Sequence, residues 1–176
     1  MLMNKPKVLL PVLVLLFLSL ITTASTAGTR AEAQSGAQTE RLTVYIQELQ
    51  KNADGSLKLT ADPIEWYEGA EADRIFAERE PEAAAEIGGT PDGYYIVNDS
   101  ETLSTYPVAA NAAVMMQIYD HTGNLEDLDI NWNESITLQK FTEEFAKTEV
   151  FDLSGSPYHL TIENGVVTSI VQQYTP

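Results

Sequence analysis

The strongest restriction on the fold lies near the C-terminus, where Asn164-Gly165 separates two runs of alternating apolar and polar residues. A type I′ turn needs a positive φ at both central positions, so this dipeptide predicts a β-hairpin. A two-residue turn sets the expected register, which pairs Glu163 with Val166, Ile162 with Val167, Leu160 with Ser169 and Tyr158 with Val171. One face of such a hairpin is apolar and would pack into a core.

Strand-like alternation recurs through most of the chain. Runs rich in β-branched and aromatic residues, with a period of two, predict strands at 42–47, 57–66, 94–97, 103–108 and 113–119. Asn52-Ala53-Asp54-Gly55 is rich in turn formers and would join the first two strands as a hairpin. Pro63 lies in the second strand and predicts an edge position or a bulge there.

The period changes to a helical one in two segments. Residues 70–79 are rich in Ala, Glu and Arg and predict a helix, which Pro81 would end. Pro81 would also begin a second helix over 82–87, and Gly88-Gly89 would end it. In the other segment, Thr137 would cap a helix that places Leu138, Phe141 and Phe145 on one face.

Seven strands and two helical segments predict an α+β domain built on a small, curved antiparallel sheet. A barrel of the oligonucleotide/oligosaccharide-binding (OB) shape is one way to close such a sheet. We expect one domain over residues 41–176, preceded by a flexible leader at 34–40.

The first 33 residues differ in composition from the rest of the chain. Lys5 and Lys7 precede 14 almost unbroken apolar residues, 8–21, and small residues follow up to Ala33. This order is typical of a secretory signal peptide, and a membrane span would need about 20 apolar residues. Cleavage after Ala33 is preferred and cleavage after Ala27 is the alternative. We therefore expect a secreted, extracellular, soluble protein with no membrane association after cleavage; a retained N-terminal anchor is the alternative.

The charge balance restricts the partners of the chain. Twenty-six acidic residues oppose ten basic ones, a net charge of −16, and removal of residues 1–33 would make it −18. Such a chain lacks the basic footprint of a nucleic-acid binder. The absence of cysteine excludes a disulfide scaffold, a thiolate metal site and a cysteine nucleophile.

Three stretches in a fixed order carry a resemblance to a known family. They are Asp62-Pro63-Ile64-Glu65-Trp66, Gly93-Tyr94-Tyr95-Ile96-Val97-Asn98 and the terminal hairpin that ends in Gln173-Tyr174-Thr175-Pro176. Their combination resembles an uncharacterised family of secreted proteins of Gram-positive bacteria, over about residues 42–176. The resemblance implies secretion and a single domain, and it carries no catalytic residue with it.

Aromatic residues on predicted strands are the first candidates for a ligand-binding surface. Trp66, Tyr95 and Trp132 could stack on sugar rings or anchor a protein partner. The alternative is that such rings belong to the core. A regular strand would turn Tyr94 and Tyr95 to opposite faces.

The acidic connection between residues 120 and 134 is the candidate metal site. Asp127, Asp129, Asn131 and Asn133 place oxygen atoms at every second position, as at the start of a calcium loop. A helix-loop-helix calcium site is excluded, because Trp132 and Leu138 occupy the positions that need Gly and Glu. The same spacing also fits a half-buried strand. The possible metal ligands are Asp120, His121, Asp127, Asp129 and Asn131.

Two functions remain open from the sequence. The first is a monomeric, non-enzymatic extracellular module that binds a protein or a glycan and has no cofactor, calcium excepted. The alternative is a metal-dependent or carboxylate-based hydrolase that uses Asp120, His121, Asp127 and Asp129. A purely structural or inhibitory module cannot be separated from the first by sequence.

Overall fold

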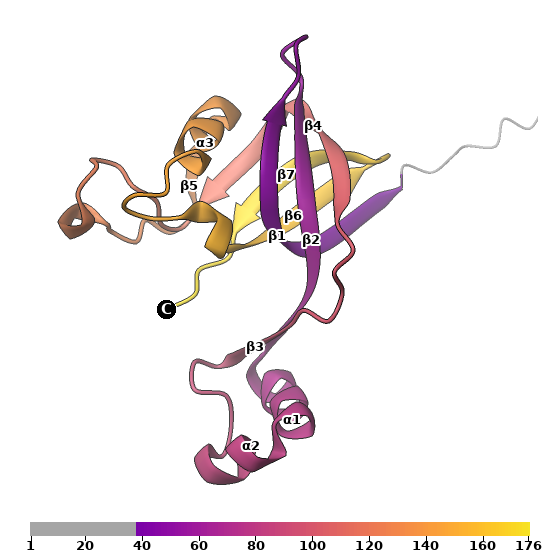
Figure 1. Ribbon diagram of the computed structural model, residues 1–176, viewed down its shortest axis with the longest axis vertical. Helices are drawn as coiled ribbons and strands as arrows, with labels where there is room; N and C mark the ends of the chain where they lie inside the picture. Colours follow the sequence, from indigo (N-terminus) through magenta and orange to yellow (C-terminus); the bar gives the residue numbers. More distant parts are fainter. Residues whose placement is uncertain (1–37) are drawn as a thin grey trace, which may run out of the picture. The chain divides into compact units, whose positions relative to one another are not determined.

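The computed structural model describes residues 38–176 (Figure 1). The predicted signal peptide lies outside the described residues. The strands are β1 (Thr39–Lys51), β2 (Leu57–Glu68), β3 (Tyr94–Val97), β4 (Ser104–Met116), β5 (Glu134–Ile136), β6 (Pro157–Glu163) and β7 (Val166–Gln172). The helices are α1 (Gly69–Arg79), α2 (Pro81–Ile87) and α3 (Leu138–Phe145), with short 3₁₀ turns at Leu125–Asp127 and Leu153–Gly155. β1 begins at Thr39, inside the stretch predicted as a leader.

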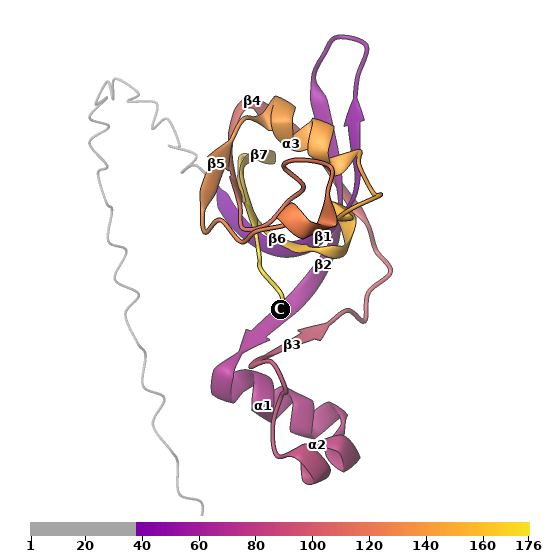
Figure 2. The same cartoon turned by 90° about the vertical axis from the view of Figure 1, so that its left-hand side faces the viewer.

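Five strands close into a barrel, as predicted for an α+β barrel fold. The sheet order is β3-β2-β1-β6-β7-β4-β5, and an additional pairing of β2 with β4 closes the ring (Figure 2). If the five barrel strands β1, β2, β4, β6 and β7 are renumbered 1 to 5 in chain order, their order around the ring is 1-2-3-5-4-1. α3 lies in the chain between the third and the fourth of them. This is the connectivity of an OB barrel. One pairing differs from the predicted antiparallel sheet, because β4 and β7 run parallel.

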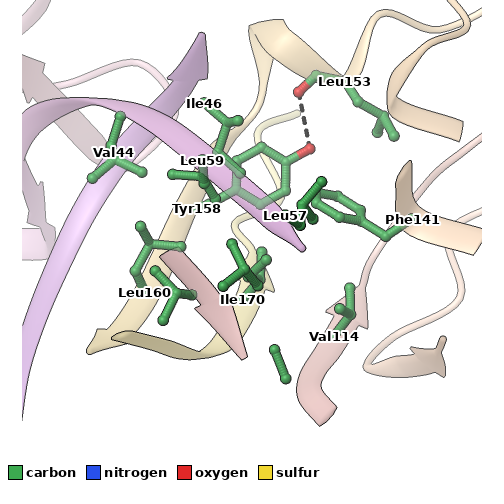
Figure 3. Packing of buried hydrophobic residues seen from close by; sticks show 14 of the residues in the cluster. Val44, Ile46, Leu57, Leu59, Val114, Phe141, Leu153, Tyr158, Leu160 and Ile170 are labelled. Carbon is green, nitrogen blue, oxygen red and sulfur yellow. Dashed lines mark hydrogen bonds between the residues drawn. The ribbon is translucent and has the colours of Figure 1, made fainter. Parts of the chain in front are cut away.

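The barrel interior is filled by alternate residues of every strand. Val44, Ile46, Leu59 and Leu160 are at most 1% exposed. α3 adds Phe141, which is fully buried and lies edge-on to Tyr158 with 5.8 Å between ring centroids. Figure 3 shows part of this core, with Val44, Phe141 and Tyr158 among the labelled residues. Burial of one such side chain contributes about 1.5–3 kcal/mol, so the closed barrel supplies most of the stability of the fold.

Tyr158 is a fully buried core tyrosine whose hydroxyl group needs a hydrogen-bond partner in this apolar interior. Its hydroxyl donates to the carbonyl oxygen of Leu153 at 2.9 Å (Figure 3). Burial raises the pKa of Tyr158, so the ring stays neutral. The bond ties the 3₁₀ turn before β6 to the end of the barrel that α3 covers.

The predicted helix caps and hairpin turn are confirmed. The Thr137 side chain accepts from the backbone N–H of Lys140 at 3.1 Å. Pro81 is the first residue of α2, and Gly88 ends it with φ of 87°. Asn164 and Gly165 have φ of 52° and 80°, as a type I′ turn requires.

The predicted register of the terminal hairpin is correct for its first two pairs and is wrong by one residue for the pairs beyond them. The observed partners of Leu160 and Tyr158 are Ile170 and Gln172, because the register shifts between Thr161 and Ile162. This shift turns Ile170 into the core, where it is fully buried, whereas the prediction placed Val171 on that face.

Two further strand predictions need correction. Residues 103–108 and 113–119, predicted as separate strands, form the single strand β4, which passes through Pro107 without a break. Its first half pairs with β2 and its second half with β7, and the register shifts between Val108 and Ala113. The three-residue β5 was not predicted.

β2 extends beyond the barrel and forms a ribbon with β3. Residues 57–61 of β2 pair with β4, and residues 65–68 pair with β3. Pro63 lies between these two segments, where β2 pairs on one side only, and this agrees with the predicted edge position. α1 packs Ala72 and Phe76, both buried, against the ribbon. Within residues 38–176, no helix has the length and apolar character needed to cross a membrane.

Candidate binding site

The β2–β3 ribbon presents two chemically different faces. Glu68 pairs with Tyr94 and Trp66 pairs with Ile96, while Tyr67 pairs with Tyr95 between them. Because side chains alternate along a strand, the even-numbered residues share one face and the odd-numbered residues share the other. Tyr94 and Tyr95 therefore lie on opposite faces of the ribbon, as predicted.

On the even-numbered face, Trp66 and Tyr94 form a stacked pair. Their ring centroids are 4.6 Å apart and the planes differ by 11°. The indole Nε1 of Trp66 donates to Oε1 of Glu68 at 2.8 Å, which fixes the orientation of the ring. Both rings are half-buried. Tyr95 is predicted as a binding residue together with Trp66, but the ring that stacks on Trp66 is Tyr94.

The same face continues onto β1. Tyr45 pairs with Asp62, and Thr43 pairs with Ile64, which is 8% exposed. The pKa of Tyr45 is raised by burial and by the nearby Tyr94 and Asp62. We call this surface the aromatic face; its residues are Tyr45, Asp62, Ile64, Trp66, Glu68 and Tyr94.

Asp62 is the least satisfied polar group of the aromatic face. Its Oδ2 accepts from Nδ2 of Asn98 at 2.9 Å. Its Oδ1 is buried and is the only such side-chain atom among residues 38–176 without a hydrogen-bond partner. A buried acceptor without a donor costs about 1–3 kcal/mol. Asp62 therefore keeps one carboxylate oxygen without a hydrogen bond.

The carboxylates of the aromatic face are not neutralised by neighbouring cations. Neither Asp62 nor Glu68 takes part in an ion pair among residues 38–176. The following segment, residues 69–103, holds nine acidic residues and two arginines. Arg74 is engaged by Glu71 and Glu78, and Arg79 by Asp99. The excess negative charge of this region is therefore left unpaired.

The odd-numbered face holds α1 in place. Tyr95 lies 5.5 Å from Phe76 of α1, centroid to centroid, and its hydroxyl donates to Oε1 of Glu80 at 2.5 Å. The hydroxyl of Tyr67 donates to Glu65 on the same side at 2.6 Å. Tyr95, predicted to bind ligand, thus lies in the packing between α1 and the ribbon.

Trp132, the third predicted binding residue, lies in a separate hollow. It is 64% exposed and meets Tyr174 edge-on, with 5.4 Å between centroids. The hollow has a volume of about 240 Å³ and is also lined by Gln117, His159 and Gln173. This is smaller than most small-molecule sites, which occupy about 300–1,000 Å³.

The predicted metal ligands are not brought together. Oδ1 of Asp120 accepts the backbone N–H groups of Thr122 and Gly123, so this carboxylate caps its own loop. Asp127 accepts from the hydroxyl of Thr122 at 2.9 Å. In the part of the chain that the structure describes, no group of three His, Cys, Asp or Glu residues could hold a metal ion. The segment with Asp129 and Asn131 is irregular, so the strand interpretation of its spacing is wrong.

His121 instead contacts Glu134, a residue that sequence reasoning missed. Nε2 of His121 lies 3.0 Å from Oε2 of Glu134, and the hydroxyl of Tyr119 donates to Oε1 of the same carboxylate at 2.7 Å. Burial alone would raise the pKa of Glu134, but these two contacts lower it below its usual range. No signal in the sequence links these residues, because Glu134 lies on the unpredicted strand β5.

A second cavity was also not predicted. It measures about 570 Å³ and lies between the β1–β2 turn, β4 and α3. Leu57, Val108 and Leu138 line it, with Lys51 and Glu143 among its polar groups. Its size suits a small molecule, but it carries no aromatic ring among its lining residues.

Comparisons with known proteins give no further identification. No protein-family model, no curated protein and no solved structure matches the chain.

Proposed function

We propose that this chain is a secreted, non-enzymatic module that binds an extracellular partner through the aromatic face. The observation that carries the proposal is the stacked pair of Trp66 and Tyr94, which is partly exposed on the face that also carries Asp62 and Glu68. Neither carboxylate forms an ion pair within the described residues. Aromatic rings that combine apolar area with adjacent polar groups are typical anchors of binding surfaces.

Secretion is part of this proposal. It is supported by the positive start, the apolar run at 8–21 and the small residues up to Ala33. Expression of the full chain with a C-terminal tag in a bacterial host would test it. We expect a product in the medium that begins at Gln34, or at Gly28 if the alternative site is used. An intact precursor that stays inside the cells would contradict it.

The hydrolase alternative is not carried forward, because Asp120 and Asp127 both accept from Thr122 within their own loop, whereas His121 contacts Glu134 on β5. Catalysis by shared metal ligation needs those groups around one point.

A comparative binding experiment tests the aromatic face. The wild-type chain, Trp66→Ala and Trp132→Ala are each immobilised and exposed to the secreted proteins and wall glycans of the producing cells. We expect a component that the wild type and Trp132→Ala retain at micromolar concentration and Trp66→Ala loses. The reverse pattern would move the site to the hollow at Trp132. No retained component on any of the three would remove the proposed function.

A further inference from the structure

We propose that the aromatic face receives a lysine or arginine side chain of a cationic polypeptide. This inference rests on the binding function proposed above and names the partner class of that site. It depends on the ring geometry, on the unpaired carboxylates and on the charge of the surrounding segment.

The geometry of the two rings favours a cation as the bound group. Trp66 and Tyr94 are almost parallel, so each ring uses one face against the other, and both side chains remain partly exposed. A cation placed over the face of Trp or Tyr is attracted by the ring quadrupole, and Trp binds best. The hydrogen bond from Trp66 to Glu68 polarises the indole and increases the electron density of its ring.

The aromatic face also offers hydrogen-bond acceptors, the carboxylates of Asp62 and Glu68, that no cation of the described residues pairs with. On this face of β2, Glu68 follows Trp66 directly and Asp62 lies two places before it, beyond Ile64. Neither carboxylate forms an ion pair within residues 38–176. Oδ1 of Asp62 has no donor at all. An ammonium or guanidinium group has several N–H donors and no acceptor, so it supplies what this face lacks. Arginine fits best, because its planar group both stacks on rings and binds carboxylates.

The negative electrostatic potential around the aromatic face also favours a cationic partner. Residues 69–103 carry nine acidic groups against two arginines that are already paired. β1 carries two basic residues, Arg41 and Lys51. Arg41 is exposed and lies outside the β1–β2 pairing, which begins at Thr43. Such a field attracts cationic chains and speeds their association. A neutral glycan gains nothing from it, and an anionic wall polymer is repelled.

The test uses the two tryptophans of the chain. In a Trp132→Phe background, Trp66 is the only indole, so its fluorescence reports the aromatic face alone. The probes are a peptide of six Arg-Gly repeats, a peptide of six Glu-Gly repeats and the neutral sugar chitohexaose. We expect the Arg-Gly peptide to change Trp66 emission with a saturating curve, and the other two probes to leave it unchanged. Raising NaCl from about 50 to about 300 mM should weaken binding about tenfold.

Two double variants with equal net charge separate the site from the general field. Asp62→Asn with Glu68→Gln removes two charges from the aromatic face. Glu126→Gln with Asp129→Asn removes two charges from the exposed loop between β4 and β5. We expect the first pair to weaken binding of the Arg-Gly peptide about tenfold or more, and the second about twofold or less. Cooperative melting confirms that both variants are folded.

The outcomes distinguish this inference from the function on which it rests. Equal weakening by both double variants, or no response of Trp66 to the Arg-Gly peptide, would overturn the cationic partner. A saturating response to chitohexaose alone would also overturn it, while leaving the aromatic face as a binding site for a glycan. The absence of any retained component on the wild type, on Trp66→Ala and on Trp132→Ala would remove the proposed function itself.

Discussion

Nε2 of His121 lies 3.0 Å from Oε2 of Glu134, although 13 residues separate them in the chain. Nδ1 of the same ring lies 3.0 Å from the backbone carbonyl oxygen of Tyr119. Both partners are acceptors, and a neutral imidazole carries a single N–H. Both contacts are hydrogen bonds only when the ring is doubly protonated. The pair ties the loop after β4 to the edge strand β5.

Replacement of Glu134 should therefore change stability in a pH-dependent way. The contacts from Tyr119 and His121 lower the pKa of Glu134 despite its burial, so the folded state prefers the carboxylate. This stabilisation is fully present above the unfolded pKa of about 4.3 and is lost as pH falls through the lower folded value. In urea unfolding, Glu134→Gln should be less stable than the wild type at pH 7, and the difference should shrink at pH 3. An equal difference at both pH values would contradict this.

Glu144 should tolerate the loss of one lysine partner but not of both. This carboxylate is 2% exposed and contacts Nζ of Lys140 at 2.7 Å and Nζ of Lys147 at 2.8 Å. Burial opposes its charge, but the two lysines lower its pKa below the usual range. Lys140→Met and Lys147→Met should each cost about 1 kcal/mol, and the double variant about 3–5 kcal/mol, because an unpaired buried charge remains.

The control for this prediction is Glu143→Ala, at an exposed neighbouring position, which should change stability by about 0.5 kcal/mol or less. A double-mutant cycle in guanidinium chloride measures the coupling between the two lysines. Additive losses in that cycle would show that the lysines act independently of the shared carboxylate.

Phe141 should be the most sensitive position of α3. It is fully buried and contacts both Tyr158 and Phe145 at the covered end of the barrel. Phe141→Ala leaves a cavity and should lower the free energy of unfolding by about 3–5 kcal/mol. Phe145→Ala removes the same group from a half-buried position and should cost less. Equal losses in chemical denaturation would mean that α3 does not cover the core through Phe141.

Much of this fold follows from local signals in the sequence. Thr137, Pro81, Gly88 and the Asn164-Gly165 turn act on the backbone beside them, and each prediction made from them is confirmed. The same is true of Pro63, whose missing N–H suits the singly paired segment of β2. These residues determine where elements begin and end whatever the rest of the chain does.

The features that sequence reasoning missed depend on long-range pairing. The shift beside Thr161 moves Ile170 into the core, and no turn residue marks it. β4 continues past Pro107 because β2 and β7 hold its two halves in turn. The candidate site has the same limit. Alternation predicts that Tyr94 and Tyr95 face opposite ways, but only the pairing of β3 with β2 decides which of them stacks on Trp66.

Substitutions of these two adjacent tyrosines should therefore affect different properties: that of Tyr94 should affect binding, and that of Tyr95 should affect the packing of α1. Tyr94→Ala removes the stacked partner of Trp66 and should weaken binding of the Arg-Gly peptide about tenfold, with a stability loss of about 1 kcal/mol. Tyr95→Ala removes the contact with Phe76 and the bond to Glu80. It should loosen α1, seen as faster amide hydrogen exchange between residues 69 and 79. Tyr95→Phe keeps the ring and should leave both binding and exchange close to wild type. If Tyr95→Phe weakened binding as strongly as Tyr94→Ala, the hydroxyl of Tyr95 would be the group that meets the ligand, and the aromatic face would be assigned to the wrong side of the ribbon.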